Sequence, residues 1–467
     1  MAKYKAYPEY KDSGVEWVGE IPEHWKMSKV RYCFSFDKGL TITKENLQDE
    51  GIPCLNYGEI HSKYGFEFNP SIHPLKCVDK KYLNANTKSL LCKGDIIFAD
   101  TSEDIIGSGN FSQLVSEVIT FAGYHTIISR PINRESYRYL AYTLDSQELR
   151  SQIQTSVKGV KVFSISQAIL RGLSLWLPRV NEQKNISTFL DYHTAKIDKL
   201  VEKQLQLIEL LKEKRQAVVS HAVTKGLNTD IPMNDSGVEW FGDVPSHWLK
   251  TIIKHIGKIN PLKTKIAPDL MKKECSFIPM ENLKLNKIIL DEHRVIKDVY
   301  NSYTYFEDKD ILMAKVTPCF ENKNIAIANN LFNGIGFGTT EIYVIRCNNQ
   351  VNNEFLFYRL QEDNFSAIAE GSMTGAGGLK RVPHEVVNSF QFYLPTIYEQ
   401  NEIASFLNSA TTKIDTLIQK QRQQIDLLKE RRTALISAAV TGKIDLRDWT
   451  PPASSTEASF TAEEATA

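Results

Sequence analysis

The residues with the most obvious potential for phosphate chemistry form a glycine-rich loop that runs from Gly371 to Lys380, GSMTGAGGLK. A loop of this kind holds phosphates when it ends in Gly-Lys-Ser/Thr, because the lysine then meets a phosphate and the hydroxyl meets magnesium. This loop lacks that ending and does not follow an evident strand. We therefore interpret it as a flexible loop that can approach another backbone closely, rather than as a nucleotide site.

Acidic and histidine residues offer a second possible chemistry, namely metal binding. Pro268-Asp269 followed by Glu321-Asn322-Lys323 is faintly similar to the Pro-Asp…Glu-x-Lys pattern of magnesium nucleases. The gap is long and the first half of the chain has no counterpart, so two surface loops are the better interpretation. The ten histidines form no His-Glu-x-x-His pair, and no Asn-Pro-Pro-aromatic or Asp-Pro-Pro-Tyr run typical of amino-methyltransferases occurs. The sequence therefore predicts a chain without catalytic or metal-binding residues.

Composition narrows the class of protein further. The 467 residues include 56 Lys+Arg and 56 Asp+Glu, so the formal net charge is zero. Neutrality argues against a strongly basic nucleic-acid binder but leaves local basic patches open. The seven scattered cysteines favour reduced thiols. No run approaches the roughly 18 to 20 apolar residues of a membrane helix, and the N-terminus lacks a secretory core. We expect a cytoplasmic protein.

The elements that must position any functional residues are duplicated. Residues 12–25 (DSGVEWVGEIPEHW) match residues 235–248 (DSGVEWFGDVPSHW) at ten of fourteen positions. Residues 177–224 match residues 394–441 at 26 of 48 positions. The segments between these flanks share only short echoes, such as Lys-Gly-Asp-Ile with Lys-Asp-Ile and two strand-like runs that end in Arg130 and Arg346. The chain is therefore a tandem duplication that keeps its frame and varies its middle.

The C-terminal part of each copy predicts a long helix. Residues 190–224 lack Gly and Pro and are rich in good helix formers. Apolar residues recur there at steps of three, four or seven, and the second copy repeats the pattern, which is typical of helices that pack lengthwise on each other. We predict an antiparallel coiled coil of two helices, each about 50 Å long. Its predicted contact residues are Ile197, Val201, Leu205, Ile208, Leu211, Val218, Ala222, Ile414, Ile418, Ile425, Leu428, Leu435 and Ala439.

The variable segments 26–176 and 249–393 predict mixed α/β modules. Short β-branched or aromatic runs, such as Asp95–Ala99 and Ile342–Arg346, alternate with turn residues, while Tyr137–Gln152 and Asn353–Glu370 predict helices. The repeated His24 and His247 lie in Pro-x-His-Trp turns and are interpreted as structural, and Trp17, Trp25, Trp240 and Trp248 as core residues. The predicted fold class is α+β, with two tandem modules, each followed by a long helix, related by pseudo-twofold symmetry.

A protein with two similar modules at a fixed separation is suited to an extended ligand such as duplex DNA, because pseudo-twofold proteins bind half-sites spaced along the helix. The repeated residues support this interpretation by resemblance. Leu-Pro-x-x-x-Glu-Gln-x-x-Ile-x-x-Phe-Leu, then Lys-Ile-Asp and Leu-Lys-Glu-(Lys/Arg)-Arg, occurs twice, as does Gly-Val-Glu-Trp-x-Gly-x-x-Pro-x-His-Trp. Over residues 4 to about 445, the chain resembles the specificity subunits of type I restriction–modification systems.

The resemblance implies a division of the chain into two target-recognition domains, each of which reads half of a bipartite DNA sequence, and two conserved spacer helices. The expected boundaries are 1–189 and 227–406 for the domains, 190–226 and 407–445 for the helices, and 446–467 for a disordered tail. The helices would set the half-site spacing and dock two methyltransferase subunits, and two restriction–translocase subunits would complete the complex. AdoMet, ATP and magnesium would belong to those partners.

The resemblance places DNA contacts only coarsely, so our residue choices rest on chemistry. Lys and Arg position phosphates, while Asn, Thr, Ser and some Lys or Arg read base edges. The predicted contacts of the first module are Lys38, Thr41, Lys44, Tyr57, Thr101, Ser102, Lys158 and Lys161. Those of the second are Lys263, Lys265, Lys315, Thr317, Lys323, Asn324, Thr374, Lys380 and Arg381. Two alternatives stay open: a nuclease or methyltransferase that acts alone, and a scaffold that binds no DNA.

Overall fold

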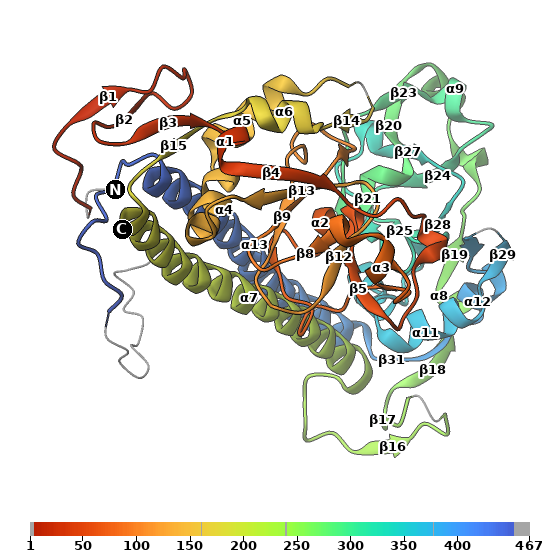
Figure 1. The fold of residues 1–467 in the computed structure, drawn as a ribbon. Coiled ribbons are helices and arrows are strands. Elements are labelled where there is room, and N and C mark those ends of the chain that lie inside the picture. The colour runs from red at the N-terminus through yellow and green to blue at the C-terminus, as the bar shows by residue number, and fades with distance from the viewer. Residues whose placement is uncertain (1–3, 160, 239–240, 377, 453–467) are drawn as a thin grey trace. The chain divides into compact units, whose positions relative to one another are not determined.

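The computed structural model describes residues 4–159, 161–238, 241–376 and 378–452. The chain forms two compact units, each made of one variable module and half of each long helix (Figure 1). Unit 1 comprises Met1–Lys203 with Gln423–Ala467, and unit 2 comprises Gln204–Arg422. The units therefore divide each long helix near its middle, whereas the sequence predicted boundaries at the helix ends.

Unit 1 contains two main sheets. The first has the order β4-β13-β9-β11-β6, in which only the β11–β6 pair is parallel. The second has the order β7-β5-β12-β8, in which only β5–β12 is parallel. The strands of these sheets are β4 (Phe34–Lys38), β5 (Ile52–Leu55), β6 (Phe66–Phe68), β7 (Cys77–Val78), β8 (Leu90–Leu91), β9 (Ile96–Ala99), β11 (Phe111–Leu114), β12 (Thr120–Ala122) and β13 (Thr126–Pro131).

Smaller antiparallel pairs and short helices complete unit 1. The paired strands are β1 (Tyr10–Asp12) with β2 (Glu20–Pro22), β3 (Lys26–Lys29) with β15 (Ser174–Leu177), and β10 (Thr101–Ser102) with β14 (Phe163–Ser164). The helices are α1 (Val30–Cys33), α2 (Tyr57–Ser62), α3 (Tyr82–Ala85), α4 (Tyr137–Asp145), α5 (Gln147–Ser156) and α6 (Gln167–Gly172). The predicted helix over Tyr137–Gln152 is thus broken at Ser146, where the backbone is extended.

Unit 2 repeats this architecture in spite of its different sequence. Its sheets have the orders β19-β28-β25-β26 and β23-β20-β27-β24, again with one central parallel pair, β20–β27. The strands are β19 (Gly257–Ile259), β20 (Glu274–Ile278), β23 (His293–Val295), β24 (Thr304–Glu307), β25 (Ile311–Ala314), β26 (Ile325–Ile327), β27 (Ile335–Gly338) and β28 (Ile342–Cys347). The two strand orders match those of unit 1 apart from β6, so the modules are duplicates at the level of fold.

The smaller elements of unit 2 follow the same plan. The paired strands are β16 (Met233–Asp235) with β17 (Asp243–Pro245), β18 (Leu249–Ile252) with β31 (Gln391–Leu394), β21 (Leu283–Lys284) with β22 (Lys287–Ile288), and β29 (Thr374–Ala376) with β30 (Leu379–Arg381). The helices are α8 (Ile253–Ile256), α9 (Ile296–Val299), α10 (Asn353–Arg359), α11 (Asp363–Gly371) and α12 (His384–Asn388). The glycine-rich loop of the sequence is therefore a β-hairpin in large part.

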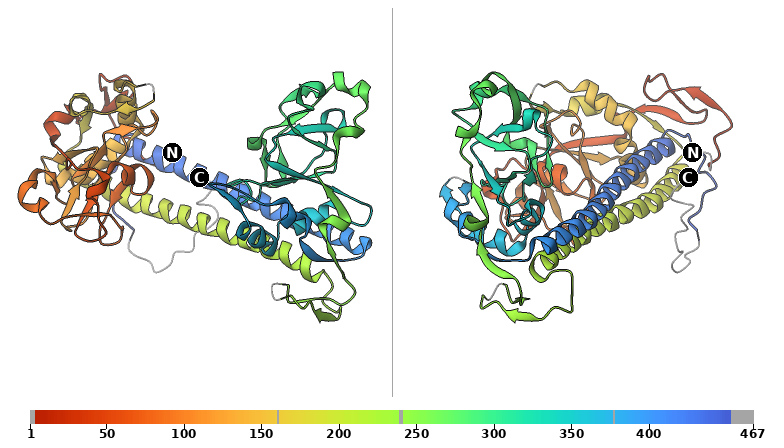
Figure 2. Two further views of the ribbon diagram at one scale, coloured as in Figure 1. Left: turned by 90° about the vertical axis from the view of Figure 1, so that its right-hand side faces the viewer. Right: turned by 180° about the vertical axis from the view of Figure 1, so that it is seen from behind.

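The two long helices are α7 (Val180–Lys225) and α13 (Ile397–Val440), which lie side by side in every view (Figures 1 and 2). Each begins about ten residues before its predicted start. The reason lies in the core: Ile186, Phe189 and Leu190 are buried in unit 1, so tertiary packing stabilises turns that contain the poorer helix formers Asn, Ser and Thr.

The helices are antiparallel within each unit. In unit 1, the Asn185 side chain donates a hydrogen bond to the carbonyl of Arg447, and Asp198 forms an ion pair with Arg432 at 3.1 Å. Later residues of α7 thus contact earlier residues of the C-terminal segment, as antiparallel helices require. In unit 2, Arg215 pairs with Asp415 at 3.0 Å. The two ion pairs are copies of each other, because Asp198 and Arg215 occupy the repeat positions of Asp415 and Arg432. Desolvation raises the pKa of Asp198 against the opposing effect of Arg432.

The apolar residues through which α7 and α13 contact each other, here called the seam, follow a heptad pattern that differs from the predicted one at a single residue. Ile197, Ile208, Ala222, Ile414, Ile418, Ile425, Leu428 and Ala439 are buried, and Val201, Leu211, Val218 and Leu435 are half-buried. Leu205 was predicted wrongly, because its side chain is 51% exposed. The half-buried Gln204 takes its place and gives steps of four, three and four from Ile197 to Ile208. The seam is therefore interrupted by a polar residue near its middle.

Two further expectations, on the tryptophans and on the C-terminal tail, can be compared with the structure. Trp25 and Trp248 are buried as predicted, but Trp17 is 43% exposed, and Trp240 lies outside the described residues. The predicted tail begins at 446, yet Leu446 is buried and the ring of Trp449 packs edge-on against Phe189. Residues 453–467 lie outside the part of the chain that the structure describes. Within that part, no helix is both long and apolar enough to span a bilayer.

Candidate nucleic-acid interface

The repeated frame holds each module by a carboxylate at the start of its long helix. In unit 1, Glu182 accepts hydrogen bonds from the Tyr7 hydroxyl at 2.5 Å and the Trp25 indole at 3.0 Å, and lies 2.9 Å from His24 Nε2. In unit 2, Glu399 accepts from the Trp248 indole at 3.0 Å and lies 2.9 Å from His247 Nε2. The Glu-Gln motif and the Pro-x-His-Trp motif are therefore two halves of one contact, which explains why both are repeated.

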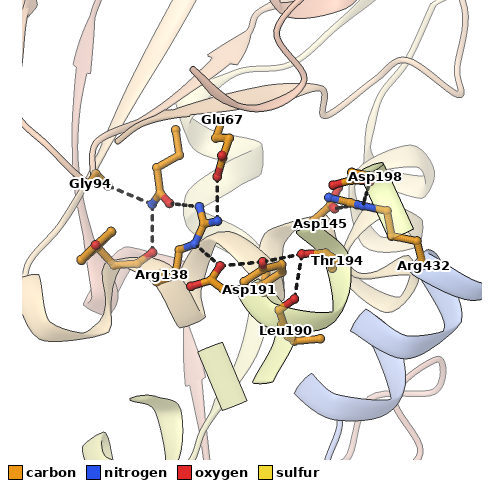
Figure 3. A network of polar contacts seen from close by, with 12 residues as sticks. Glu67, Gly94, Arg138, Asp145, Leu190, Asp191, Thr194, Asp198 and Arg432 are labelled. Atoms are coloured by element: carbon orange, nitrogen blue, oxygen red, sulfur yellow. Dashed lines mark hydrogen bonds and ion pairs between the residues drawn. The ribbon is translucent and has the colours of Figure 1, made fainter. Parts of the chain in front are cut away.

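Further polar contacts fasten the module of unit 1 to α7 (Figure 3). The Arg138 guanidinium on α4 contacts Glu67 of β6 at 2.6 Å and Asp191 of α7 at 2.7 Å. The Tyr142 hydroxyl donates to Asp191 at 2.7 Å and lies 3.1 Å from the hydroxyl of Thr194. Unit 2 repeats the last arrangement with Tyr358, whose hydroxyl donates to Asn408 at 2.8 Å and lies 3.1 Å from the hydroxyl of Thr411. These contacts fasten α4 to α7 in unit 1 and α10 to α13 in unit 2.

The short echoes between the modules form a second repeated feature, an ion pair between adjacent central strands. Asp95, just before β9, is buried and pairs with Arg130 of β13, and Asp310, just before β25, is buried and pairs with Arg346 of β28 at 2.6 Å. Burial raises the pKa of Asp310, although the hydrogen bonds from Arg346 oppose this shift. The echoes are therefore structural, and they align the two modules residue by residue.

The loops that carry many of the predicted DNA contacts meet at the opposite end of these strands. In unit 1, Lys38 ends β4 beside β13, and Thr41 follows in an exposed loop. Thr101 follows β9 and begins β10, which pairs with β14. Lys158 and Lys161 lie shortly before β14 in the sequence, and both are exposed. Tyr57, at the start of α2, places its ring 5.4 Å from that of His125, just before β13. Lys44 is exposed in a short 3-10 helix after Thr41.

Unit 2 brings together the corresponding loops. The backbone N–H of Val382 donates to the carbonyl of Lys315 at 2.8 Å, and that of Thr317 donates to the carbonyl of Lys380 at 3.0 Å. The loop after β25 is thus paired with the second strand of the β29–β30 hairpin, in which Thr374 lies opposite Arg381. Lys380, Arg381 and Thr374 are exposed, and Lys315 is half-buried. These four predicted residues lie in one patch.

Several other predicted contacts have structural roles instead. Ser102 and Thr317 are only 8% exposed, and the Thr317 hydroxyl donates to the carbonyl of Gly378 at 2.8 Å. Lys323 donates to Gln216 of α7 at 3.0 Å and to Asp363 at 2.8 Å, so its ammonium is directed to the helices. For these three residues, the structure does not support direct contact with bases in this conformation.

The remaining predicted residues of the second module lie apart from the patch or are half-buried. Lys263 donates to the carbonyl of Tyr300 and lies over the ring of that residue at 5.2 Å. Asn324 is half-buried, and its carbonyl accepts the N–H of Ala314 at 2.9 Å. The side chain of Lys265 lies outside the described residues.

The sequence reasoning missed two polar residues at the same end of the strands in unit 1, Asp100 and His125. Asp100 directly follows β9 and lies 3.2 Å from the ring of His125. The available signal was the echo between Gly123–Arg130 and Gly338–Arg346, which places His125 opposite Glu341 when the paired arginines are aligned. Among the described residues, no group of three or more His, Cys, Asp or Glu side chains is arranged to hold a metal ion.

Comparison with known proteins identifies the family to which this chain belongs. The family profile described as "Type I restriction modification DNA specificity domain" matches residues 22–210 and 253–427. The chain is 36% identical over 187 residues to the type I restriction enzyme EcoAI specificity subunit of Escherichia coli, a match that covers 39% of this chain and 31% of that protein. This region thus spans about a third of that relative.

A longer match covers almost the whole chain. The type I restriction enzyme StySPI specificity subunit of Salmonella potsdam is 23% identical over 435 residues, which covers 91% of this chain and 90% of that protein. A solved chain, from work on complex assembly and conformational transition of the type I R-M system, is 14% identical with a TM-score of 0.62 and covers 91% of this chain and 99% of its own length. At that identity, the likeness supports the fold alone.

Proposed function

The chain belongs to the type I restriction–modification DNA specificity family, and from this premise we propose that its two modules each read one half of a bipartite DNA sequence. The observation that carries the proposal is the contrast within each unit. The strand order, the carboxylate contacts of Glu182 and Glu399, and the buried Asp–Arg pairs are kept, while the residues at the loop ends of the central strands differ. A frame that is kept around a surface that varies fits two readers of different half-sites.

The chemistry of the loop ends supports DNA as the ligand. Unit 2 presents Lys315, Lys380 and Arg381 in one patch, and cationic side chains of this kind contact phosphates and guanine edges. Unit 1 presents Lys38, Tyr57 and Thr101 at the corresponding strand ends. The neutral chain then binds DNA weakly by itself, because phosphate neutralisation supplies most non-specific affinity.

The long helices are proposed to set the distance between the half-sites and to dock two methyltransferase subunits. The helices of 46 and 44 residues are about 65 to 70 Å long. One turn of DNA is about 34–36 Å long, so a spacer of this length can serve half-sites on separate turns.

The chain is proposed to be non-catalytic and to act in the cytoplasm of a bacterium or archaeon. Methyl transfer from AdoMet would occur on the methyltransferase subunits. Two restriction–translocase subunits would use ATP and magnesium. This division agrees with the sequence, in which the methyltransferase motifs do not occur and the faint Pro-Asp…Glu-x-Lys similarity is interpreted as two surface loops.

The test is to co-express the chain with a methyltransferase subunit of the same kind of system and to map methylated adenines in random DNA. The expected result is a split motif with two short specific parts. Replacing residues 26–176 with the corresponding segment of a relative should then alter one part of the motif and leave the other unchanged. Methylation or cleavage by the purified chain alone, or a change in both parts after the exchange, would contradict the proposal.

A further inference from the structure

One pair of hydrogen-bonded residues is equivalent in the two units, and the first residue of the pair carries opposite charges in the two modules. It is formed by the residue after the central strand β9 or β25 and the residue before the adjacent strand β13 or β28. The N–H of Asp100 donates to the carbonyl of His125 at 3.0 Å, and the N–H of Lys315 donates to the carbonyl of Glu341 at 3.0 Å. Asp100 therefore corresponds to Lys315, and His125 to Glu341.

In unit 1 this position offers hydrogen-bond acceptors and an aromatic surface. Asp100 Oδ1 lies 3.2 Å from His125 Nδ1, and their side chains are 31% and 56% exposed. His125 has a φ of 55°, a left-handed conformation that is uncommon for a residue with a side chain. The rings of Tyr57 and Tyr124 pack edge-on against His125, at 5.4 and 5.9 Å. An exposed polar pair is thus held on an aromatic base.

In unit 2 the same position offers a donor. Arg381 donates two hydrogen bonds of 2.9 Å to the carboxylate of Glu341, and these bonds hold the pKa of Glu341 below its usual value. The Lys315 ammonium lies 5.5 Å from the centre of the Tyr343 ring. With Glu341 occupied by Arg381, the cation of Lys315 is the group that distinguishes this position from Asp100.

The other end of the same strands shows that this difference is not general drift. There, the buried pairs Asp95–Arg130 and Asp310–Arg346 keep the same residue types in both units. A position that only supported the fold would have no reason to reverse its charge between two units that share strand order and backbone hydrogen bonds. A position that reads different bases would have to change.

We propose that Asp100 with His125 and Lys315 with Glu341 are the specificity-determining positions of the two modules. Asp100 accepts from the exocyclic amino group of cytosine or adenine in one half-site, because carboxylates read such donors in the major groove. Lys315 donates to N7 and O6 of guanine in the other half-site. This inference rests on the proposed function, to which it adds the residues that read and the class of base that each reads.

The test maps methylated adenines for the wild-type chain and two double variants, each co-expressed with the methyltransferase subunit. Asp100→Lys with His125→Glu should change the preference at one or more base pairs of one half-site by about tenfold or more, and leave the other half-site unchanged. Lys315→Asp with Glu341→His should change only the other half-site. If both double variants keep the wild-type motif at every base pair, the inference is wrong.

A matched control and a milder variant keep the result interpretable. Glu117→Lys makes the same change in charge as Asp100→Lys, but Glu117 pairs with Lys93 near the opposite end of β9. It should leave the motif unchanged, and a shift equal to that of the first double variant would refute the inference. If that double variant gives no methylation, Asp100→Ala, which removes the acceptor, decides the question. Relaxed preference at one base pair supports the inference, and the full wild-type preference overturns it. A wild-type chain without any specific motif would instead refute the proposed function.

Discussion

The carboxylate at the start of each long helix should stabilise unit 1 more than unit 2, because the two copies differ in one partner. Glu182 is 6% exposed and serves the buried groups of Tyr7 and Trp25 as well as the half-exposed His24. Glu399 serves Trp248 and His247. The repeat position of Tyr7 is Asp230, an exposed residue, so this hydroxyl has no equivalent in unit 2.

The magnitude follows from the donors that each substitution would leave without an acceptor. A buried donor without a partner costs about 1–3 kcal/mol. Glu182→Ala leaves two such donors, so we expect a loss of about 2–6 kcal/mol in the free energy of local unfolding. Glu399→Ala leaves one, so the expected loss is about 1–3 kcal/mol. The histidines add little in either unit because water can reach their rings.

Hydrogen–deuterium exchange on the full-length chain can measure both effects at once, because peptides around Trp25 and Trp248 report on separate units. A difference of about 2 kcal/mol corresponds to roughly 30-fold faster exchange near Trp25 in Glu182→Ala than near Trp248 in Glu399→Ala. Tyr7→Phe is the matched control, since it gives Glu182 the same partners as Glu399 and should cost about 1 kcal/mol. Equal effects of the two alanine substitutions would refute the reasoning.

Three other predictions concern the seam, the thiols and the spacer. Ile208 is buried between the helices and Leu205 is exposed, so Ile208→Ala should lower the free energy of unfolding by about 2–4 kcal/mol and Leu205→Ala should change it by less than about 0.5 kcal/mol. Equal losses in urea denaturation would contradict this assignment of the helix contacts. Burial raises the pKa of the Cys275 thiol to about 11, so this thiol is protonated at pH 8. When the folded chain is alkylated at pH 8, mass spectrometry should detect the label first on the exposed Cys92, and on Cys275 only after unfolding. Seven residues inserted at the middle of both α7 and α13 add about 10.5 Å of helix, which equals the length of about three base pairs. The gap between the two parts of the methylated motif should lengthen by that number, and an unchanged gap would refute the role of the helices as a spacer.

The local features of the fold could be predicted because their signals are local. The tandem duplication, the helical frame and the strands over Asp95–Ala99 and Ile342–Arg346 follow from identity, residue type and spacing, and the structure contains all of them. The seam phase could be predicted only in part. Residues 205–211 (LQLIELL) place leucine or isoleucine on several faces of the helix, so the sequence fits more than one choice of stripe. Packing selects the phase that contains Gln204 and exposes Leu205.

The candidate site divides in the same way. Residue chemistry was enough to select the loops that meet at the strand ends. Only the tertiary structure showed that Thr317 and Lys323 form hydrogen bonds inside unit 2, because their partners Gly378 and Gln216 are 61 and 107 residues away in the sequence. It also joined Glu182 to Trp25 across 157 residues, and placed Asp100 beside His125. The sequence alone determined that the frame is repeated and the middle varied, because duplication leaves a direct record in residue identities. Which polar groups face solvent was decided by packing, because burial depends on contacts between residues far apart in the chain.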